Sequence, residues 1–245
     1  RRASLKVMTE TKPIRICQMI SLRDGLKSWG KITEEIVNRI ANPEIEIIIK
    51  DLPEAPVNTI MSMDDCHQVA PYNVKAAVQA EKEGFDAITT GCLLDPGLDE
   101  MRNQTDKIIA VGDCEAVMHI GSMLGERISL IMPSKEQTGL LSEDDIIPLI
   151  NKYGFREKLC SVRGVSFSSL DFAARKGDLP ELMLEQANLA VNNDGADVIM
   201  GYGSLDVINY LRKNLSVPVL ESIECTIVIA ISLVRLRNLQ LSEHT

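Results

Sequence analysis

The sequence predicts an α/β protein of two pseudo-symmetric lobes, each a parallel-type sheet flanked by helices, with the active-site cleft between them. Two observations predict this fold. Short apolar runs alternate with helical patterns along the chain, and the runs are unbroken, as is typical of strands that are buried on both faces. A strand–turn–helix pattern also recurs in the second half of the chain, which indicates an internal duplication.

The apolar runs give the expected strands, and the segments between them give the expected helices. Apolar side chains recur at helical spacing in 31–41, 73–83 and 179–193. Regular alternation of the two kinds of segment predicts parallel sheets with helices on both faces. The expected strands are 14–20, 45–49, 87–90, 108–111, 128–132, 162–167, 198–200 and 217–220.

The internal repeat is clearest where EKEGFDAITTGC (81–92) resembles VNNDGADVIMGYG (191–203). Gly84 matches Gly195. Asp86 matches Asp197, and each Asp stands six residues before a turn position. That turn position is the last residue of each segment, a cysteine in the first copy and a glycine in the second.

Each copy continues into a second strand, a glutamate and an apolar helix. Glu115 precedes the expected helix 116–124, and Glu224 precedes the expected helix 226–234. Two lobes of this kind place the carboxyl ends of their strands on one cleft, which is where open α/β sheets bind ligands. Glu115 and Glu224 then either orient groups in the cleft or cap the helices that follow them.

The expected lobe limits follow from the repeat. The first lobe is expected to take 8–105 plus 219–245, and the second lobe 106–218. Residues 1–7 read as an expression tag, with Met8 as a plausible initiator.

Composition argues against several classes of partner. The chain has 245 residues and a formal net charge of −9, which disfavours nucleic acid and anionic membranes. Aromatic residues make up only 4%, so stacking surfaces for bases are not expected. The longest near-apolar stretch, 223–234, contains Glu224 and is too short to span a bilayer.

The six cysteines are expected to be reduced thiols in a cytoplasmic protein. The chain is long, no secretory signal is seen, and no pair has CxxC spacing. His67 adjoins Cys66 and Asp65, but no second Cys/His pair follows at finger spacing, so no metal site is expected. His119 is expected to pack or cap within its helix.

Among the six cysteines, Cys92 in the first turn is the strongest candidate for a catalytic residue. Cys92 follows Gly91 at the end of the strand 87–90, and Asp95 is expected to cap a helix that starts near Pro96. Backbone N–H groups in such a turn can bind a carboxylate or an oxyanion, and their field lowers a thiol pKa. The alternative is a buried cysteine that merely packs under the helix.

The second turn, IMGYGSLD (199–206), combines small and hydroxyl residues. Gly201 and Gly203 permit close approach of the backbone to a ligand, and Tyr202 and Ser204 add hydroxyl groups. The fragment half-matches a dinucleotide fingerprint, but the third glycine is missing and the motif follows the seventh strand rather than the first.

The chain resembles the aspartate/glutamate/hydantoin racemase superfamily, and most of all its hydantoin racemase branch. The resemblance lies in GFDAITTGCLLDPGLDEMR, IIAVGDCEAVMHIGSMLGERISLI, GADVIM and VPVLESIECTIVIA. It implies two lobes, no cofactor, and one cysteine from each lobe. One thiolate removes the proton α to a carboxylate or carbonyl, and the other thiol reprotonates the opposite face. It also implies a small carboxylate, amino-acid derivative or hydantoin-like ligand, and a homo-oligomer.

The chain departs from the family pattern in the second lobe. Gly203, with Tyr202 before it, stands where the second cysteine is expected, and the polar turn after the first strand retains only Ser21. The expected catalytic residues are therefore Cys92, with Tyr202 or Ser204 on the other face. The expected substrate-binding residues are Ser21, Gly91, Leu93, Gly203, Ser134 and Glu115.

Three functions remain open at this point. The first is a racemase or epimerase in which Cys92 is one acid/base group and Tyr202, Ser204 or water serves the other face. The second is a single-cysteine lyase that works on one face, as arylmalonate decarboxylases do. The third is a non-catalytic protein that binds a small carboxylate or heterocycle, because a fold does not fix a function.

Overall fold

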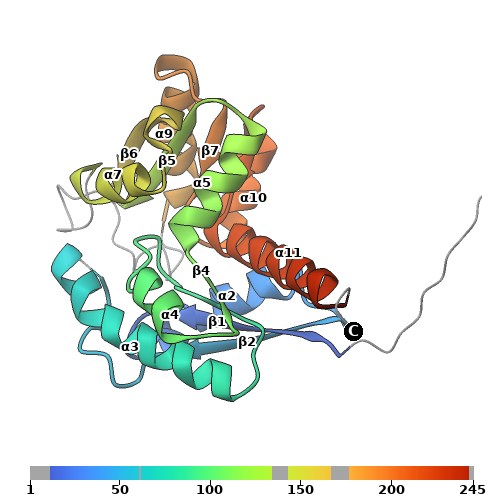
Figure 1. Ribbon diagram of the computed structural model, residues 1–245. Coiled ribbons are helices and arrows are strands. Elements are labelled where there is room, and N and C mark those ends of the chain that lie inside the picture. The colour runs from blue at the N-terminus through green and yellow to red at the C-terminus, as the bar shows by residue number, and fades with distance from the viewer. Residues whose placement is uncertain (1–11, 61, 134–142, 167–176, 243–245) are drawn as a thin grey trace, which may run out of the picture.

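The strands form two parallel sheets of four strands each, in the orders β2-β1-β3-β4 and β6-β5-β7-β8 (Figure 1). The structure is a computed structural model that describes residues 12–60, 62–133, 143–166 and 177–242. The strands are β1 Ile14–Ile20, β2 Ile45–Asp51, β3 Ala87–Thr89, β4 Ile109–Val111, β5 Ile128–Pro133, β6 Leu159–Val165, β7 Val198–Met200 and β8 Val219–Leu220. The predicted α/β fold with two similar sheets is confirmed.

Helices connect the strands. They are α1 Gly25–Ser28, α2 Gly30–Val37, α3 Met63–Lys82, α4 Leu98–Gln104, α5 Asp113–Leu124, α7 Glu143–Lys152, α9 Leu179–Asn193, α10 Leu205–Asn214 and α11 Ser222–Ser242, with a 3₁₀ turn at Arg156–Lys158. Helix α3 is longer than the expected 73–83. Its start is fixed by Ser62, whose hydroxyl accepts a hydrogen bond from Asp65 N over 3.2 Å.

Each sheet is covered on both faces. Helices α3 and α4 pack on one face of the first sheet, and α9 and α10 pack on one face of the second. The other faces of the two sheets meet in a single hydrophobic cluster that also contains α5, α7 and α11. The two lobes therefore share a continuous core, although each has its own sheet.

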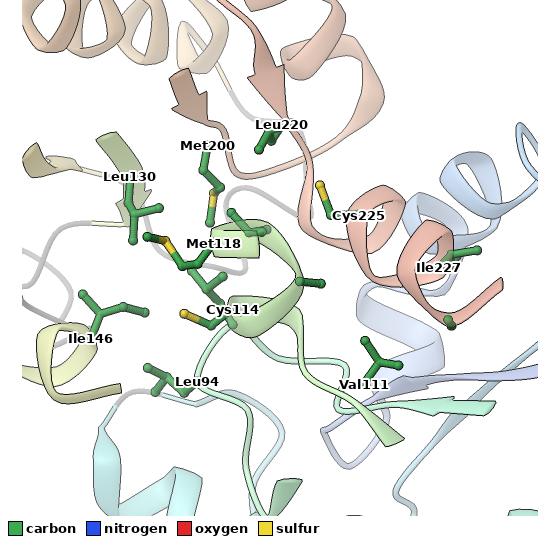
Figure 2. Close-up of a cluster of buried hydrophobic side chains, with 14 of the residues drawn as sticks. Leu94, Val111, Cys114, Met118, Leu130, Ile146, Met200, Leu220, Cys225 and Ile227 are labelled. Carbon is green, nitrogen blue, oxygen red and sulfur yellow. The ribbon is translucent and has the colours of Figure 1, made fainter. Parts of the chain in front are cut away.

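Two helices exchange between the lobes. Helix α5 follows the first sheet but packs against β5 and β7 of the second, and α11 follows the second sheet but packs against β1, β3 and β4 of the first. Figure 2 shows Cys114 and Met118 of α5 between Leu94 on one side and Leu130 and Met200 on the other. This exchange positions the N-termini of both helices at the junction of the lobes.

The duplication is visible at matching hydrogen bonds before β3 and β7. Arg15 N donates to the Asp86 carboxylate over 3.0 Å, and Arg127 N donates to the Asp197 carboxylate over 2.8 Å. Each Asp N–H donates back to the carbonyl of the same arginine. The pair Asp86 and Asp197, matched in the sequence repeat, thus makes the same contact in both lobes.

The lobe limits remain a prediction. Strand pairing puts β4 in the first sheet and β8 in the second. If the sheets alone defined the lobes, the chain would pass from the first lobe to the second between α5 and β5, and not at 105/106. The expected tag at 1–7 and Met8 lie outside the described residues. Across the described part of the chain, no helix is both long and apolar enough to cross a bilayer.

Candidate active site

A cavity of about 120 Å³ lies between the carboxyl ends of the two sheets. It is lined from the first lobe by the end of β1, by α2 and by the turn after β3. The second lobe contributes the ends of β5, β7 and β8. The lining side chains are mostly apolar, and the polar or titratable ones among them are Gln18, Thr33, Cys92, Asp113, Tyr202, Glu221 and Ser222. The cavity thus lies at the carboxyl ends of the strands, where the sequence predicts the ligand site.

The turn that carries Cys92 depends on Gly91. The φ angle of Gly91 is +64°, and a Cβ at this residue would lie 2.2 Å from Met19 O. Only glycine allows the end of β3 to approach β1 so closely. Gly91, Cys92 and Leu93 all line the cavity, so the turn itself forms one wall.

The thiol of Cys92 differs from the sequence-based expectation. Burial raises the pKa of Cys92 well above its ordinary value, and the charge of Asp113 adds to the rise. The Leu94 N–H group stabilises the thiolate, but by less than burial destabilises it. The expectation that the turn lowers this pKa is therefore wrong for the ligand-free protein, in which Cys92 is a thiol at neutral pH.

Asp95 caps a different helix from the expected one. Helix α4 begins at Leu98 with Gly97 as its N-cap, whereas the Asp95 carboxylate accepts hydrogen bonds from Cys114 N and Glu115 N, both over 3.1 Å. It thereby caps α5, which lies further along the chain. Burial raises the pKa of Asp95 to about 6 despite these donors. Asp95 N also donates to Cys92 O over 2.9 Å, which holds the cysteine turn in place.

The second turn brings Tyr202 and Gly203 to the cavity. The ring of Tyr202 packs edge-on against Trp29, with 5.6 Å between centroids. Burial raises the pKa of the Tyr202 hydroxyl far above its usual range. Ser204 is fully buried and does not line the cavity, and its hydroxyl has no hydrogen-bond partner within the described part of the chain.

Two carboxyl groups at the cavity did not stand out in the sequence. Asp113, the first residue of α5, accepts a hydrogen bond from the Thr226 hydroxyl over 2.6 Å and another from Cys92 N. Glu221 follows β8 and accepts a hydrogen bond from Glu224 N over 2.8 Å, as a cap of α11. Burial raises the pKa of each of the two to about 7. A sequence signal for Glu221 existed, since it directly follows the expected strand 217–220.

Gln18 was also missed, because it lies inside the apolar run 14–20. Its side chain is 1% exposed and lines the cavity. Its Nε2 donates to Met19 O over 2.9 Å, while its Oε1 has no hydrogen-bond partner among the described residues. A buried acceptor without a partner is costly unless a ligand supplies the donor.

Other expected site residues lie away from the cavity. The Ser21 hydroxyl is buried and contacts Thr90 O and Asn73. Glu115 forms an ion pair with Arg102 over 2.5 Å, and Glu224 forms an equivalent pair with Arg212. Neither glutamate lines the cavity. The substrate roles expected for Ser21 and Glu115 stay predictions.

The remaining expectations concern histidine, serine and metal. The ring of His119 packs edge-on against Phe155, with 4.8 Å between centroids, as a packing role predicts. Ser134 lies outside the described residues. Within the ranges that the structure describes, no group of three His, Cys, Asp or Glu side chains has an arrangement that could hold a metal ion.

Two α/β lobes whose strand-end turns meet at one cavity define an α/β protein of racemase type. The chain belongs to the Asp/Glu/Hydantoin racemase family, whose model matches residues 29–230. It is similar to a hydantoin racemase from Pseudomonas sp. (strain NS671), with 28% identity over 178 residues, 72% of this chain and 69% of that protein.

Solved structures show the same fold. The allantoin racemase from Klebsiella pneumoniae superposes with a TM-score of 0.80 at 22% identity, covering 91% of this chain and 88% of that one. An arylmalonate decarboxylase superposes with a TM-score of 0.56 at 18% identity, covering 90% and 92%. The resemblance to the racemase family seen in the sequence is thus confirmed, and the chain is a racemase-family enzyme.

Proposed function

We propose that the protein is a cofactor-independent isomerase that inverts a carbon atom α to a carbonyl group in a small ring compound of the hydantoin type. Cys92 is the acid and base on one face of that carbon. The observation that carries the proposal is the position of the Cys92 turn, which forms one wall of the cavity between the lobes. Relatives of this chain carry the names hydantoin racemase and allantoin racemase.

The lining of the cavity favours an uncharged substrate over a carboxylate. The described lining residues include Asp113 and Glu221 but no Lys, Arg or His side chain. A carboxylate ligand would meet two acidic groups there, whereas a cyclic amide offers N–H donors to carboxyl and amide oxygens. The unpartnered Gln18 Oε1 is an acceptor of the kind that a ring N–H would satisfy.

Removal of the α-proton leaves an enolate, whose negative charge needs donors. The backbone N–H groups of the two strand-end turns, around Cys92 and Gly203, are the groups proposed to stabilise it. Protonated Asp113 would assist, since burial raises its pKa to about 7 and a neutral carboxyl can donate a hydrogen bond.

Exchange in D₂O tests this function. Each enantiomer of a 5-substituted hydantoin and of allantoin is incubated with the protein, and the α-hydrogen is followed by NMR together with optical rotation. An isomerase replaces the α-hydrogen by deuterium and abolishes the rotation, and Cys92→Ala stops the loss of rotation. If no enantiomer exchanges, or if Cys92→Ala retains the wild-type rate, the proposal is wrong.

A one-face lyase is the second candidate, because Gly203 stands where a two-base racemase of this family has its second cysteine. Such an enzyme would release CO₂ from an arylmalonate and leave a product of one configuration. Release of CO₂ without racemisation of any hydantoin would favour this candidate. Ligand binding with neither reaction would favour a non-catalytic binding protein.

A further inference from the structure

We propose that Glu221 carries the proton on the face of the substrate opposite to Cys92, in place of the cysteine that the second lobe lacks. The inference rests on the proposed isomerase function and adds a catalytic residue to it.

Glu221 belongs to the lobe that faces Cys92. It directly follows β8, which pairs with β7, and Gly201 N donates to Leu220 O over 3.0 Å beside it. Cys92 follows β3 in the other sheet, and both residues line the same cavity. The two groups therefore enter the cavity from opposite sheets, as acid and base of a racemase must do.

The turn after β7 is not built to hold a cysteine. Gly203 has a φ angle of +124°, a backbone conformation that side-chain-bearing residues rarely adopt. A proton carrier for this side has to come from a neighbouring position. In the described part of the second lobe, the titratable side chains that line the cavity are Tyr202 and Glu221.

Glu221 is the better proton carrier of the two. Burial raises the pKa of Tyr202 so far that the phenol stays protonated near neutral pH, whereas the pKa of Glu221 rises only to about 7. A group with a pKa near the working pH can both accept and donate a proton. The charged groups that act on Glu221 are Glu224 of α11, which disfavours its ionisation, and Arg212 of α10, which favours it.

Asp113 has a similar pKa but lies on the side of Cys92. It follows β4, the neighbour of β3, and its carboxylate accepts hydrogen bonds from Cys92 N and the Thr226 hydroxyl. It therefore lies beside Cys92, whereas Glu221 lies at the carboxyl end of the other sheet.

Glu221 and Cys92 together account for both proton transfers of the inversion. In one direction, the Glu221 carboxylate accepts the α-proton, the C–H electron pair moves into the carbonyl to form the enolate, and the Cys92 thiol donates its proton to the opposite face. The product leaves Glu221 protonated and Cys92 as a thiolate. Proton exchange with water restores the starting state, and the other enantiomer follows the reverse path.

The test is the choice of enantiomer that exchanges in D₂O. Wild type is expected to exchange and invert both enantiomers. Glu221→Gln is expected to lose racemisation by at least about 100-fold, yet to exchange the one enantiomer whose α-hydrogen faces Cys92, with retention of configuration. Cys92→Ala is expected to exchange only the other enantiomer. Opposite selectivity of the two variants is the signature of two facing acid–base groups.

Glu185→Gln is the matched control, since Glu185 is exposed on α9 of the second lobe and does not line the cavity. It is expected to racemise like the wild type. Racemisation by Glu221→Gln at the wild-type rate would overturn the inference and leave the proposed function intact. Loss of exchange for both enantiomers in a Glu221→Gln protein with native circular dichroism would overturn it as well. Absence of exchange in the wild type would instead contradict the proposed function.

Discussion

The hydroxyl of Tyr153 donates a hydrogen bond to the buried carboxylate of Asp95 over 2.8 Å. Tyr153 directly follows α7 of the second lobe, and Asp95 lies in the turn after β3 of the first. The same carboxylate caps α5, and Asp95 N holds Cys92 O. Asp95 therefore links the turn that carries Cys92, helix α5 and the second lobe.

Tyr153→Phe is expected to destabilise the protein, and more strongly at higher pH. The hydroxyl stabilises the ionised form of Asp95, whose pKa is about 6, so its loss raises that pKa further. The free energy of unfolding should fall by about 2 kcal/mol at pH 8 and by less at pH 5. Urea unfolding at the two pH values measures the difference.

The control for this substitution is Tyr210→Phe, because Tyr210 lies partly exposed on α10. It is expected to change the unfolding free energy little at either pH. An equal loss for Tyr153→Phe at pH 5 and pH 8 would mean that the hydroxyl does not stabilise a charged Asp95.

Alkylation of Cys92 by iodoacetamide is expected to be slow at neutral pH. Burial raises the pKa of this thiol well above its ordinary value, and only the thiolate reacts. The rate, followed by peptide mass spectrometry, should rise with pH beyond pH 9. A second thiol, Cys160, is partly exposed in β6 and serves as the internal comparison. Preferential labelling of Cys92 at pH 7 would contradict the assignment of a neutral thiol.

Much of the fold is predictable from the sequence because buried parallel strands leave a local signal. Strands β1 and β7 have the expected bounds. Edge strand β6 is only partly buried, and polar residues interrupt its apolar run. The expected strand 162–167 therefore begins later than the observed strand, which starts at Leu159. The first half of α3 is polar and contains Pro71, which hid its helical character.

The site is less predictable because its contacts are not local. Cys92 and the second turn could be found, since each follows a strand end in a repeated pattern. The helix that Asp95 caps lies on another part of the chain, so the local rule that an Asp before Pro caps the next helix gave the wrong partner. Gln18 looks like part of a strand, and only the assembled cavity reveals its unpartnered oxygen.

Gln18→Met is expected to lower substrate affinity without lowering stability. Methionine has a similar shape and removes the buried Oε1 that has no partner among the described residues. Removing an unsatisfied buried polar atom gains about 1 kcal/mol, which offsets the loss of the bond from Nε2 to Met19 O. The KM for the preferred hydantoin should rise by roughly tenfold while kcat changes less.

Steady-state kinetics and urea unfolding of the same preparation check this prediction. Gln68→Met, on the exposed N-terminal part of α3, is the matched control and should leave both kinetics and stability unchanged. A strong loss of stability in Gln18→Met would show that the amide is held by partners other than a substrate. An unchanged KM would show that Oε1 receives no donor from the ligand.

Glu221→Gln is expected to stabilise the protein above neutral pH while it abolishes racemisation. Burial raises the pKa of Glu221 from 4.5 to about 7, so the folded state binds a proton that the unfolded chain has lost. The stability that Glu221 contributes is fully present below about pH 4.5 and is lost as the pH rises through about 7. At pH 8 the variant should therefore exceed the wild type by up to about 3 kcal/mol, and at pH 4.5 the two should be nearly equal.

Urea unfolding at pH 4.5 and pH 8 gives this comparison. Asp113 titrates in the same range with its pKa raised to about 7, so the variant keeps part of the wild-type pH dependence. Glu100→Gln, an exposed position on α4, should leave the difference between the two pH values as in the wild type, because its side chain is solvated in both states. A Glu221→Gln protein that is less stable than the wild type at pH 8 would mean that the carboxylate is stabilised by α11 more than burial destabilises it. That outcome would also remove the physical basis for Glu221 as a group that gains and loses a proton near neutral pH.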